Sequence, residues 1–439
     1  MNNTASLRRT SLRERLEHAL SGRMAPTVIA TALLTVILIS FKPFEKFDPL
    51  TRTGGDAVNQ LGFGLLGAVS IFSLLAFADR RMLLGLLSPW WLLLLAFFML
   101  SVFNADDPSS AMRTAAFTLI GIMTMAVVLT LPRDADSFST ALAVAGFSVV
   151  GLCYVGLVIY PDLARHTADS LEPEHAGLWR GLYSHKNVAG PVMASLSFAG
   201  LYLFRRGWHW AGGLLFILAL FFMSNTGSKT TAGLVPLAII LVIGPSIFGL
   251  RRLAPLVFAL ALGGAAIGTV GIVLSPTLWD MSQAIAPGLT YTGRTSLWIF
   301  LLEHIAQRPW TGFGYESFWG TMRVFTTDQA FDRDWDIRGI VHGHNGYLDL
   351  AVLMGLPALA VAIITFILAP LRDFLRVPRL RENVLVADFF LMILLFTALN
   401  ALLESFFFRR ADPVWLFFIL ATLGLRQAAR FPMATRVPD

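Results

Sequence analysis

Residues 137–160 read SFSTALAVAGFSVVGLCYVGLVIY, and this stretch contains no Asp, Glu, Lys or Arg. An α-helix rises about 1.5 Å per residue, so about 20 apolar residues cross the hydrocarbon core of a bilayer. Inside that core a helix pairs its backbone N–H and C=O groups within one segment, which an isolated strand cannot do. The stretch therefore predicts a transmembrane helix.

The same pattern recurs along the whole chain of 439 residues. Apolar residues make up 56% of it and charged residues only 14%, whereas soluble domains average about 45–50% and 25%. The other apolar segments of comparable length are 24–41, 59–78, 82–103, 111–131, 187–204, 208–224, 230–248, 254–274, 346–370, 384–404 and 412–427. We therefore expect an all-α fold, a polytopic membrane helix bundle of about 12 transmembrane helices.

Two connectors are much longer than the others, and long connectors in compact proteins usually carry function. The expected organisation is a cytoplasmic tail (1–23), a transmembrane bundle of about nine spans (24–274) with an external loop (161–186), a large periplasmic loop (275–345), three C-terminal spans (346–427) and a cytoplasmic tail (428–439). We expect the large loop to carry short amphipathic helices.

Basic residues lie mainly in alternate connectors, which indicates the orientation of the bundle. Arginine pairs occur at 80–81, 205–206 and 251–252, and further arginines occur within 372–381 and 426–436. Cytoplasmic loops of membrane proteins are enriched in Lys and Arg, so both termini are predicted to be cytoplasmic. This topology accounts for the net charge of +6, and we expect no nucleic-acid partner. A single cysteine excludes an intramolecular disulfide.

The first external loop ends with LWRGLYSHKNVAG at residues 178–190. This places Arg180, His185 and Lys186 at the mouth of a span. The two-pronged guanidinium of Arg and the point charge of Lys together match a diphosphate. The alternative is that these side chains only extend from a helix end to the membrane interface.

A short connector at residues 224–230 reads SNTGSKT. Its glycine spacing differs from that of a phosphate-binding loop and no strand precedes it, so a nucleotide site is not expected. Lys229 is instead predicted either to contact an anionic lipid head group or to lie in a solvated turn.

The large loop contains TGRTSLWIFLLEHIAQR at residues 292–308. Apolar residues recur there at helical spacing, at Leu297, Phe300, Leu301 and Ile305. Such a helix would lie in the interface plane, with its apolar side against lipid or the bundle. Arg294 at its N-terminus lies where the helix dipole favours an anion. The glycine-rich segment 309–315 lacks the context of a dinucleotide fingerprint, so we expect no cofactor.

The large loop closes with VHGHNGYLDL at residues 341–350. Histidine is the natural general base near neutral pH, and His344 stands at the entrance to a span. Asp349 follows five residues later. His342 and His344 could instead form a metal pair, but no further ligands accompany them at helical spacing, so we expect no metal site.

Together these segments resemble the O-antigen ligase and Wzy polymerase superfamily of bacterial envelope enzymes. His344 and Asn345, followed by nine residues and Gly355, match the closing motif of that family in spacing and position. Its pattern is also followed, in the expected order, by segments 228–230, 293–298 and 309–315. Residues 172–187 are most similar to the exopolysaccharide polymerases of the ExoQ type.

The resemblance implies glycan transfer from an undecaprenyl-diphosphate carrier to an acceptor hydroxyl at the periplasmic face of the bacterial inner membrane. Such enzymes are inverting and metal-independent and use no cofactor. The implied partners are the lipid-linked glycan donor, a glycan or lipid-linked acceptor, membrane lipids and other components of polysaccharide export. A polymerase and a ligase share this chemistry and differ in the acceptor, and a polymerase is favoured here.

The resemblance also implies roles for individual residues. Cations that would hold the diphosphate and stabilise its developing charge are Arg180, Arg294, Lys186 and Lys229. His344 would take the proton of the attacking hydroxyl, and Asn345 or Asp349 would orient it. The rival from another class is a transporter or lipid-linked oligosaccharide flippase, which predicts matched halves and polar residues at the membrane midplane.

Overall fold

The computed structural model describes residues 22–45, 56–168, 173–328 and 336–436. Among these residues the regular elements are helices, together with one isolated bridge between Arg165 and Trp179. The all-α fold expected from the sequence is confirmed. The predicted tail 1–23 lies almost entirely outside the described residues, as does the end of the predicted C-terminal tail.

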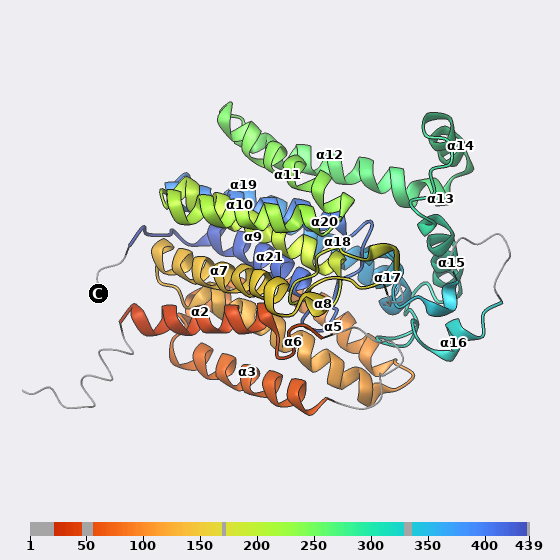
Figure 1. Cartoon of the computed structure of the whole chain (residues 1–439), viewed down its shortest axis with the longest axis horizontal. Helices are drawn as coiled ribbons and strands as arrows, with labels where there is room; N and C mark the ends of the chain where they lie inside the picture. The colour runs from red at the N-terminus through yellow and green to blue at the C-terminus, as the bar shows by residue number, and fades with distance from the viewer. Residues whose placement is uncertain (1–21, 46–55, 169–172, 329–335, 437–439) are drawn as a thin grey trace, which may run out of the picture.

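Most helices run roughly parallel to one long axis (Figure 1). The helices of this bundle are α2 (Met24–Ile39), α3 (Ala57–Ala76), α4 (Arg80–Leu86), α5 (Pro89–Phe103), α6 (Pro108–Thr130), α7 (Ala135–Ile159), α9 (Lys186–Arg206), α10 (His209–Asn225), α11 (Lys229–Ile247), α12 (Ala254–Ala266), α18 (Leu356–Ile363), α19 (Ala369–Arg376), α20 (Arg381–Asn400) and α21 (Pro413–Arg430). The shorter helices near the other connectors are α8 (Pro161–Ala164), α13 (Ile272–Leu274), α14 (Pro276–Ile285), α15 (Arg294–Gln307), α16 (Met322–Phe325) and α17 (Gly346–Met354). The π-helical turns η4 (Ile267–Gly271) and η6 (Ile364–Leu368) continue α12 and α18.

Local sequence explains where several of these helices begin. Asp107 precedes α6, and its carboxylate accepts the backbone N–H groups of Ser109 and Ser110. Asp412 caps α21 in the same way. Both helices then begin with proline, which lacks the N–H that would be unpaired in a first turn. These capped starts fix the helix ends that surround the candidate site.

Eight helices within the described residues are long and apolar enough to cross a membrane. They are Ala57–Ala76, Pro108–Thr130, Ala135–Ile159, Lys186–Arg206, Lys229–Ile247, Arg251–Leu274, Leu356–Arg376 and Arg381–Asn400. The pair α4 and α5, bent by 66°, brings the number to nine if it counts as one span. The membrane bundle is confirmed, whereas the expected count of about 12 spans is not.

Two predicted spans have different limits in the structure. The segment 346–370 was expected to be one span, but the helix breaks at Gly355, whose φ is 86°. The membrane-length helix there runs over Leu356–Arg376, and α17 is a separate short helix. The segment 384–404 was also drawn too long, because α20 ends at Asn400.

Ion pairs join the helices at one end of the bundle. Arg206 Nε lies 2.6 Å from a carboxylate oxygen of Glu382. Asp388, which is fully buried in α20, pairs with Arg205 at 3.0 Å and Arg251 at 3.1 Å. An intramembrane carboxylate is tolerated when it is paired in this way. This is the end to which the sequence assigns the arginine-rich connectors.

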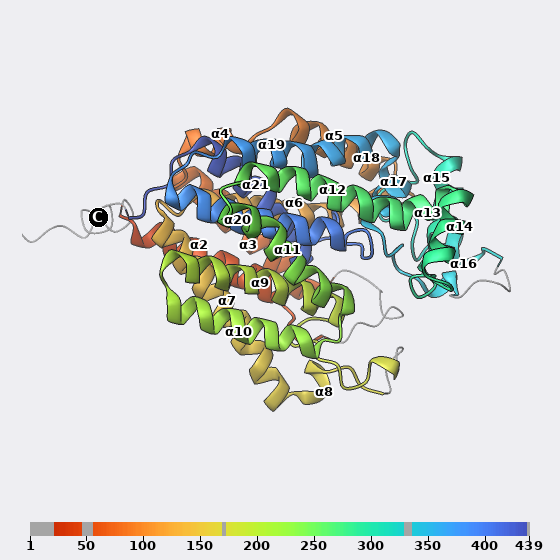
Figure 2. The ribbon, with the colours of Figure 1, turned by 90° about the horizontal axis from the view of Figure 1, so that it is seen from above.

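The short helices α13 to α17 gather at the opposite end (Figures 1 and 2). They enclose a separate apolar core whose fully buried side chains include Trp298, Leu301 and Phe318. The helix predicted within residues 292–308 is present as α15, and its apolar face packs against protein in this core. This second core holds the first residue of α15 and the residues before α17 in fixed positions.

The glycine-rich segment 309–315 packs against the break between α17 and α18. The N–H of Phe313 donates to the carbonyl of Val352 at 2.8 Å. Gly312 and Gly355 both have positive φ, and a Cβ atom at either would meet the backbone of the facing segment. The glycines in this segment therefore serve close backbone packing.

Candidate active site

Three distant segments of the chain meet at the carboxylate of Glu404. Its Oε1 accepts hydrogen bonds from Arg294 Nη2 at 2.9 Å and from Asn187 Nδ2 at 3.0 Å. Its Oε2 lies 3.2 Å from Nδ1 of His344. The side chains of Arg294, Glu404 and His344 are only 14–17% exposed, so these charged groups are held largely out of bulk water.

Each of these residues is placed by the start or end of a helix. Glu404 lies in the turn that follows α20, where its N–H donates to the carbonyl of Asn400. Asn187 belongs to the first turn of α9, and Arg294 is the first residue of α15. Helix starts and ends therefore bring the cluster together at one end of the bundle.

His344 adopts an unusual backbone conformation. Its φ is 46°, in the left-handed region that costs a non-glycine residue about 1–3 kcal/mol. The neighbouring Asn345 supports this geometry, because it caps α17 through the N–H groups of Tyr347 and Leu348. Its amide also donates to the carbonyl of Leu402 at 3.1 Å. The imidazole of His344 is thereby turned toward Glu404.

The charged groups of this cluster shift the pKa values of their neighbours. Burial lowers the pKa of His342 well below its usual range, and the charges of His344, Arg409 and Arg294 lower it further. For Glu404, burial acts to raise the pKa, but the hydrogen bond and charge of His344 and the charge of Arg294 lower it below its ordinary value. An ionised carboxylate thus lies beside the guanidinium of Arg294, a group that also favours an anionic ligand.

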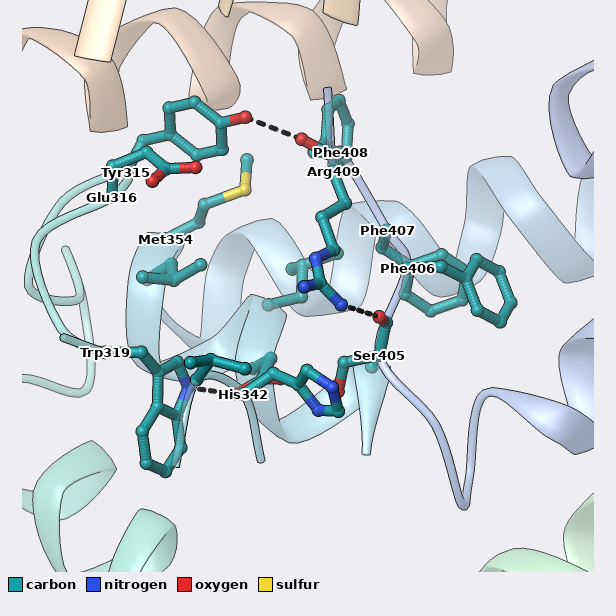
Figure 3. Close-up of a pocket in the computed structure, with 15 residues that line it drawn as sticks. Tyr315, Glu316, Trp319, His342, Met354, Ser405, Phe406, Phe407, Phe408 and Arg409 are labelled. Carbon is teal, nitrogen blue, oxygen red and sulfur yellow. Dashed lines mark hydrogen bonds between the residues drawn. The ribbon is translucent and has the colours of Figure 1, made fainter. Parts of the chain in front are cut away.

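A cavity of about 90 Å³ opens beside this cluster (Figure 3). The imidazole of His342 and the guanidinium of Arg409 point into it, and Arg409 Nη1 donates to the carbonyl of Ser405 at 3.2 Å. Trp319 Nε1 donates to Asp349 Oδ1 at 2.7 Å on another wall. Burial raises the pKa of Asp349, although hydrogen bonds from Ser405 and Trp319 oppose that effect. The cavity combines aromatic walls with cationic and acidic groups.

The structure assigns Arg180 a different place from the one expected. Arg180 is only 4% exposed, and its Nη1 donates to the backbone carbonyls of Glu45, Tyr183 and Ser184 at 3.0–3.3 Å. These hydrogen bonds stabilise the loop at residues 161–186 and join it to the residue that follows α2 and its turn, Glu45. The expected contact between Arg180 and a diphosphate is therefore not part of the site that the structure describes.

Asn345 and Asp349 also differ from expectation, since neither has a described contact with the imidazole of His344. Asn345 is a helix cap, and the Asp349 carboxylate accepts the N–H of Gly343 and the indole of Trp319. Glu404 holds the position that we had expected one of them to take.

The remaining predicted site residues lie at the starts of α9 and α11. His185 caps α9 by accepting the N–H of Asn187 at its Nδ1, 3.1 Å away, and Lys186 is the first residue of the helix. Lys229 is exposed at the start of α11, directly after Ser228, which approaches α9 at Gly190. A ligand role for these three residues stays a prediction.

Two residues of the site were missed in the sequence. Glu404 was the final residue of an expected span, and Arg409 followed it in the segment ALLESFFFRR at 401–410. The sequence feature that could have indicated them is a single acid followed by two arginines at the end of an otherwise apolar segment. Ionisable residues at such a place are usually functional or paired.

Comparison with known proteins bears on this geometry. Residues 212–363 match the Wzy_C family, described as O-Antigen ligase. This part of the chain is similar to O-antigen ligases. The resemblance to this superfamily is thereby confirmed, and the matched segment runs from α10 to the end of α18. A search of curated proteins finds no significant match.

The segment that matches the Wzy_C family contains part of the cluster at Glu404. Arg294 and His344 lie within the matched residues, whereas Asn187 precedes them and Glu404 follows them. The site therefore depends on helices outside the matched domain. The match to the Wzy_C family is consistent with membrane glycosyltransferase activity. A charged site at the end of a bundle of membrane-length helices fits that activity.

The structure also changes the case for a metal. We expected no metal at His342 and His344 because the sequence offered no third ligand. In the structure, possible ligand atoms of His342, His344 and Glu404 lie within 4.8 Å of one another. A second group of three side chains with this property is formed by His166, His175 and His185. At the first group, His342 Nδ1 already accepts the N–H of His344 at 3.3 Å.

Proposed function

We propose that the protein transfers a glycan from an undecaprenyl-diphosphate carrier to an acceptor hydroxyl at the periplasmic face of the bacterial inner membrane. The proposal rests on one observation above all: Arg294 and His344 contact the same carboxylate, that of Glu404. In this proposal the cation that binds the diphosphate thus lies beside the base that takes the hydroxyl proton. The similarity to O-antigen ligases supports the same class of reaction.

In the proposed step, His344 acts as the general base. Its Nδ1 faces Glu404, so a proton on Nδ1 leaves Nε2 free to take the proton of the acceptor hydroxyl. The hydroxyl oxygen then bonds to the anomeric carbon, from the face opposite the carrier. The bond from that carbon to the diphosphate oxygen breaks, and its electron pair leaves with the diphosphate. Glu404 stabilises the imidazolium that forms.

Arg294 is proposed to stabilise the departing diphosphate. Its Nη2 is engaged by Glu404, whereas its buried Nε has no hydrogen-bond acceptor among the described residues. An unsatisfied buried N–H costs about 1–3 kcal/mol, and a diphosphate oxygen would satisfy it. The guanidinium then acts where negative charge develops. Lys186 and Lys229 would contribute further positive charge along the entry to the site, and His185 would contact the substrate there.

The step uses protein cations in place of a metal ion and needs no cofactor. A lipid-linked diphosphate keeps its head group at the membrane surface, so the cations that bind it must lie at one end of the bundle. The cluster at Glu404 includes Asn187 in the first turn of α9, whereas Arg206, which pairs with Glu382, lies at the other end of that helix. Figure 1 shows that α9 runs along the bundle, which supports a position of the cluster at one end of it. The arginine-rich connectors at that opposite end support a periplasmic location for the site, with both termini in the cytoplasm.

We favour polymerisation of exopolysaccharide or O-antigen repeat units over ligation to lipid A-core, because the loop at 172–187 is most similar to exopolysaccharide polymerases. Reconstitution in vesicles with only the lipid-linked repeat unit decides between them. A ladder of longer glycans supports the polymerase. A donor that stays unchanged until lipid A-core is added, and is consumed only then, supports the ligase. Movement of the donor across the vesicle membrane without any change in glycan length would overturn both and indicate a flippase.

A further inference from the structure

Three histidines gather in the external loop, outside the cluster at Glu404. His166 follows α8, His175 ends a short 3-10 turn, and His185 caps α9. Each ring offers a nitrogen within 4.8 Å of a nitrogen from each of the other two. The rings are steeply inclined to one another, at 69°, 78° and 74°.

The spacing of the rings matches three ligands around one ion. Their centroids are 5.6, 4.8 and 5.5 Å apart. When three imidazoles bind zinc tetrahedrally at about 2.0–2.1 Å, their ring centroids lie roughly 5 Å from one another. Random packing of three rings would not require this near-equal spacing. We propose that His166, His175 and His185 form a site for a divalent transition metal, with zinc as the ion to test.

The same histidines sit at the points where the loop folds back on itself. The N–H of Gly177 donates to the carbonyl of His166 at 2.9 Å, and the N–H of Leu178 donates to that of His175 at 3.0 Å. The bridge between Arg165 and Trp179 closes the same turn. A metal bound by three histidines would tie this turn to the N-cap of α9. Three protein ligands leave the fourth coordination position open to water.

The hydrogen bonds of the rings set the cost of binding. Nε2 of His166 accepts the N–H of Lys186 and Nδ1 of His185 accepts the N–H of Asn187, both at 3.1 Å. A neutral imidazole has one lone pair, so each of these two rings must give up its main-chain hydrogen bond or shift its proton when a metal binds. We therefore expect zinc affinity in the micromolar range that rises with pH as protons are released.

This site would act on the candidate active site through α9. His185 caps the helix, and Asn187, two residues later, donates to Glu404. A metal that fixes His185 would thus fix one of the three contacts of Glu404. This consequence rests on the proposed function, whereas metal binding itself does not.

The test measures zinc on the full-length protein purified in detergent, by metal content after dialysis and by the shift in thermal unfolding on zinc addition. We expect one zinc ion per chain, and at least a tenfold loss of affinity in His175→Ala. His209→Ala is the matched control, because His209 begins α10 at the far end of the bundle, and it should bind zinc normally. His342→Ala reports on the other candidate group and should also bind normally.

The opposite pattern overturns the proposal. Zinc binding that survives in His175→Ala, or that is lost in His342→Ala, would remove the three-histidine site. If His175→Ala does not fold, His175→Cys decides the matter, because a thiolate retains a zinc ligand and should keep the affinity within about tenfold. Failure of glycan transfer in a protein that binds zinc as expected would count against the proposed function alone.

Discussion

Arg294 Nη2 donates to Glu404 Oε1 at 2.9 Å, although the two residues are 110 positions apart. Arg294 is the first residue of α15, whereas Glu404 follows α20 in the C-terminal part of the bundle. Their contact links the loop to the bundle at the place where His344 also reaches the carboxylate. The carboxylate of Glu404 therefore holds a guanidinium and an imidazole close together, and its negative charge offsets their repulsion whenever the imidazole is protonated.

Glu404→Gln should reduce glycan transfer by about 100-fold or more while the protein still inserts and folds. The amide keeps the size of the side chain but cannot stabilise a positively charged imidazole at His344. The rate is measured with lipid-linked donor in vesicles, normalised to folded protein. Glu316→Gln is the control, because this exposed acid on the cavity rim lies outside the hydrogen bonds of Glu404. Equal rates for Glu404→Gln and wild type would remove Glu404 from the mechanism.

His344→Ala should abolish product, because it removes the imidazole that is proposed to accept the hydroxyl proton and that contacts Glu404. The measurement is the glycan ladder formed by reconstituted protein, with the thermal unfolding midpoint recorded in parallel. A variant that folds normally and still extends the glycan at the wild-type rate contradicts the assignment of the base.

Arg294→Ala should also abolish product, and Arg294→Lys should restore little of it. Lysine keeps the charge but cannot contact Glu404 and a diphosphate at the same time through a planar fork. Arg338→Lys is a suitable control, because Arg338 pairs with Asp336 on the exposed surface of the loop. Full rescue by lysine would mean that charge alone is sufficient at this position.

Arg180→Met should lower stability, whereas the transfer rate per folded molecule should persist. The substitution leaves the carbonyls of Glu45, Tyr183 and Ser184 without their donor, at about 1–3 kcal/mol for each buried group that water cannot reach. Thermal unfolding in detergent measures the first effect, and transfer normalised to folded protein measures the second. A stable but inactive variant would restore the diphosphate role expected from the sequence.

Stability should fall as the pH drops below about 6.5, the usual pKa of histidine, in part because of His342. Burial lowers the pKa of His342, so on acidification the unfolded chain binds a proton before the folded protein does. Under that condition stability rises with pH, and it is lost as the pH falls. Thermal unfolding between pH 5 and 8 should therefore show a smaller pH dependence in His342→Gln than in wild type or His209→Gln.

Chelator should not slow glycan transfer in His175→Ala, which lacks the proposed zinc site. The leaving diphosphate is neutralised by Arg294 in our mechanism, so the chemical step itself does not depend on a metal. Comparison of wild type and His175→Ala, each with and without chelator, separates the two sites. Inhibition that persists in His175→Ala would place a metal at His342, His344 and Glu404.

The part of the site that could be predicted came from motifs that are local in sequence. His344 was recognised at the entrance to a helix, and Arg294 at the start of another. Both positions follow from short-range patterns of apolar residues and helix starts. Glu404 and Arg409 were missed because their contacts are with residues far away in the chain, and nothing in their own neighbourhood specifies those partners.

Arg180 illustrates the opposite failure. Its sequence neighbourhood suits a phosphate ligand, but three backbone carbonyls that need a donor surround it in the fold. A guanidinium contributes the same hydrogen bonds to a ligand or to a loop, so residue type could not separate the two uses.

The sequence by itself determined that the chain is an all-helical membrane bundle, because long apolar segments must pair their backbone within helices in a bilayer. It also placed the polar chemistry in the connectors, where charged side chains avoid the cost of the hydrocarbon core. Only the tertiary structure decided which charges meet. It joined Asn187, Arg294 and His344 at Glu404 and turned Arg180 inward, because hydrogen bonds form between groups brought together by packing, whatever their distance along the chain.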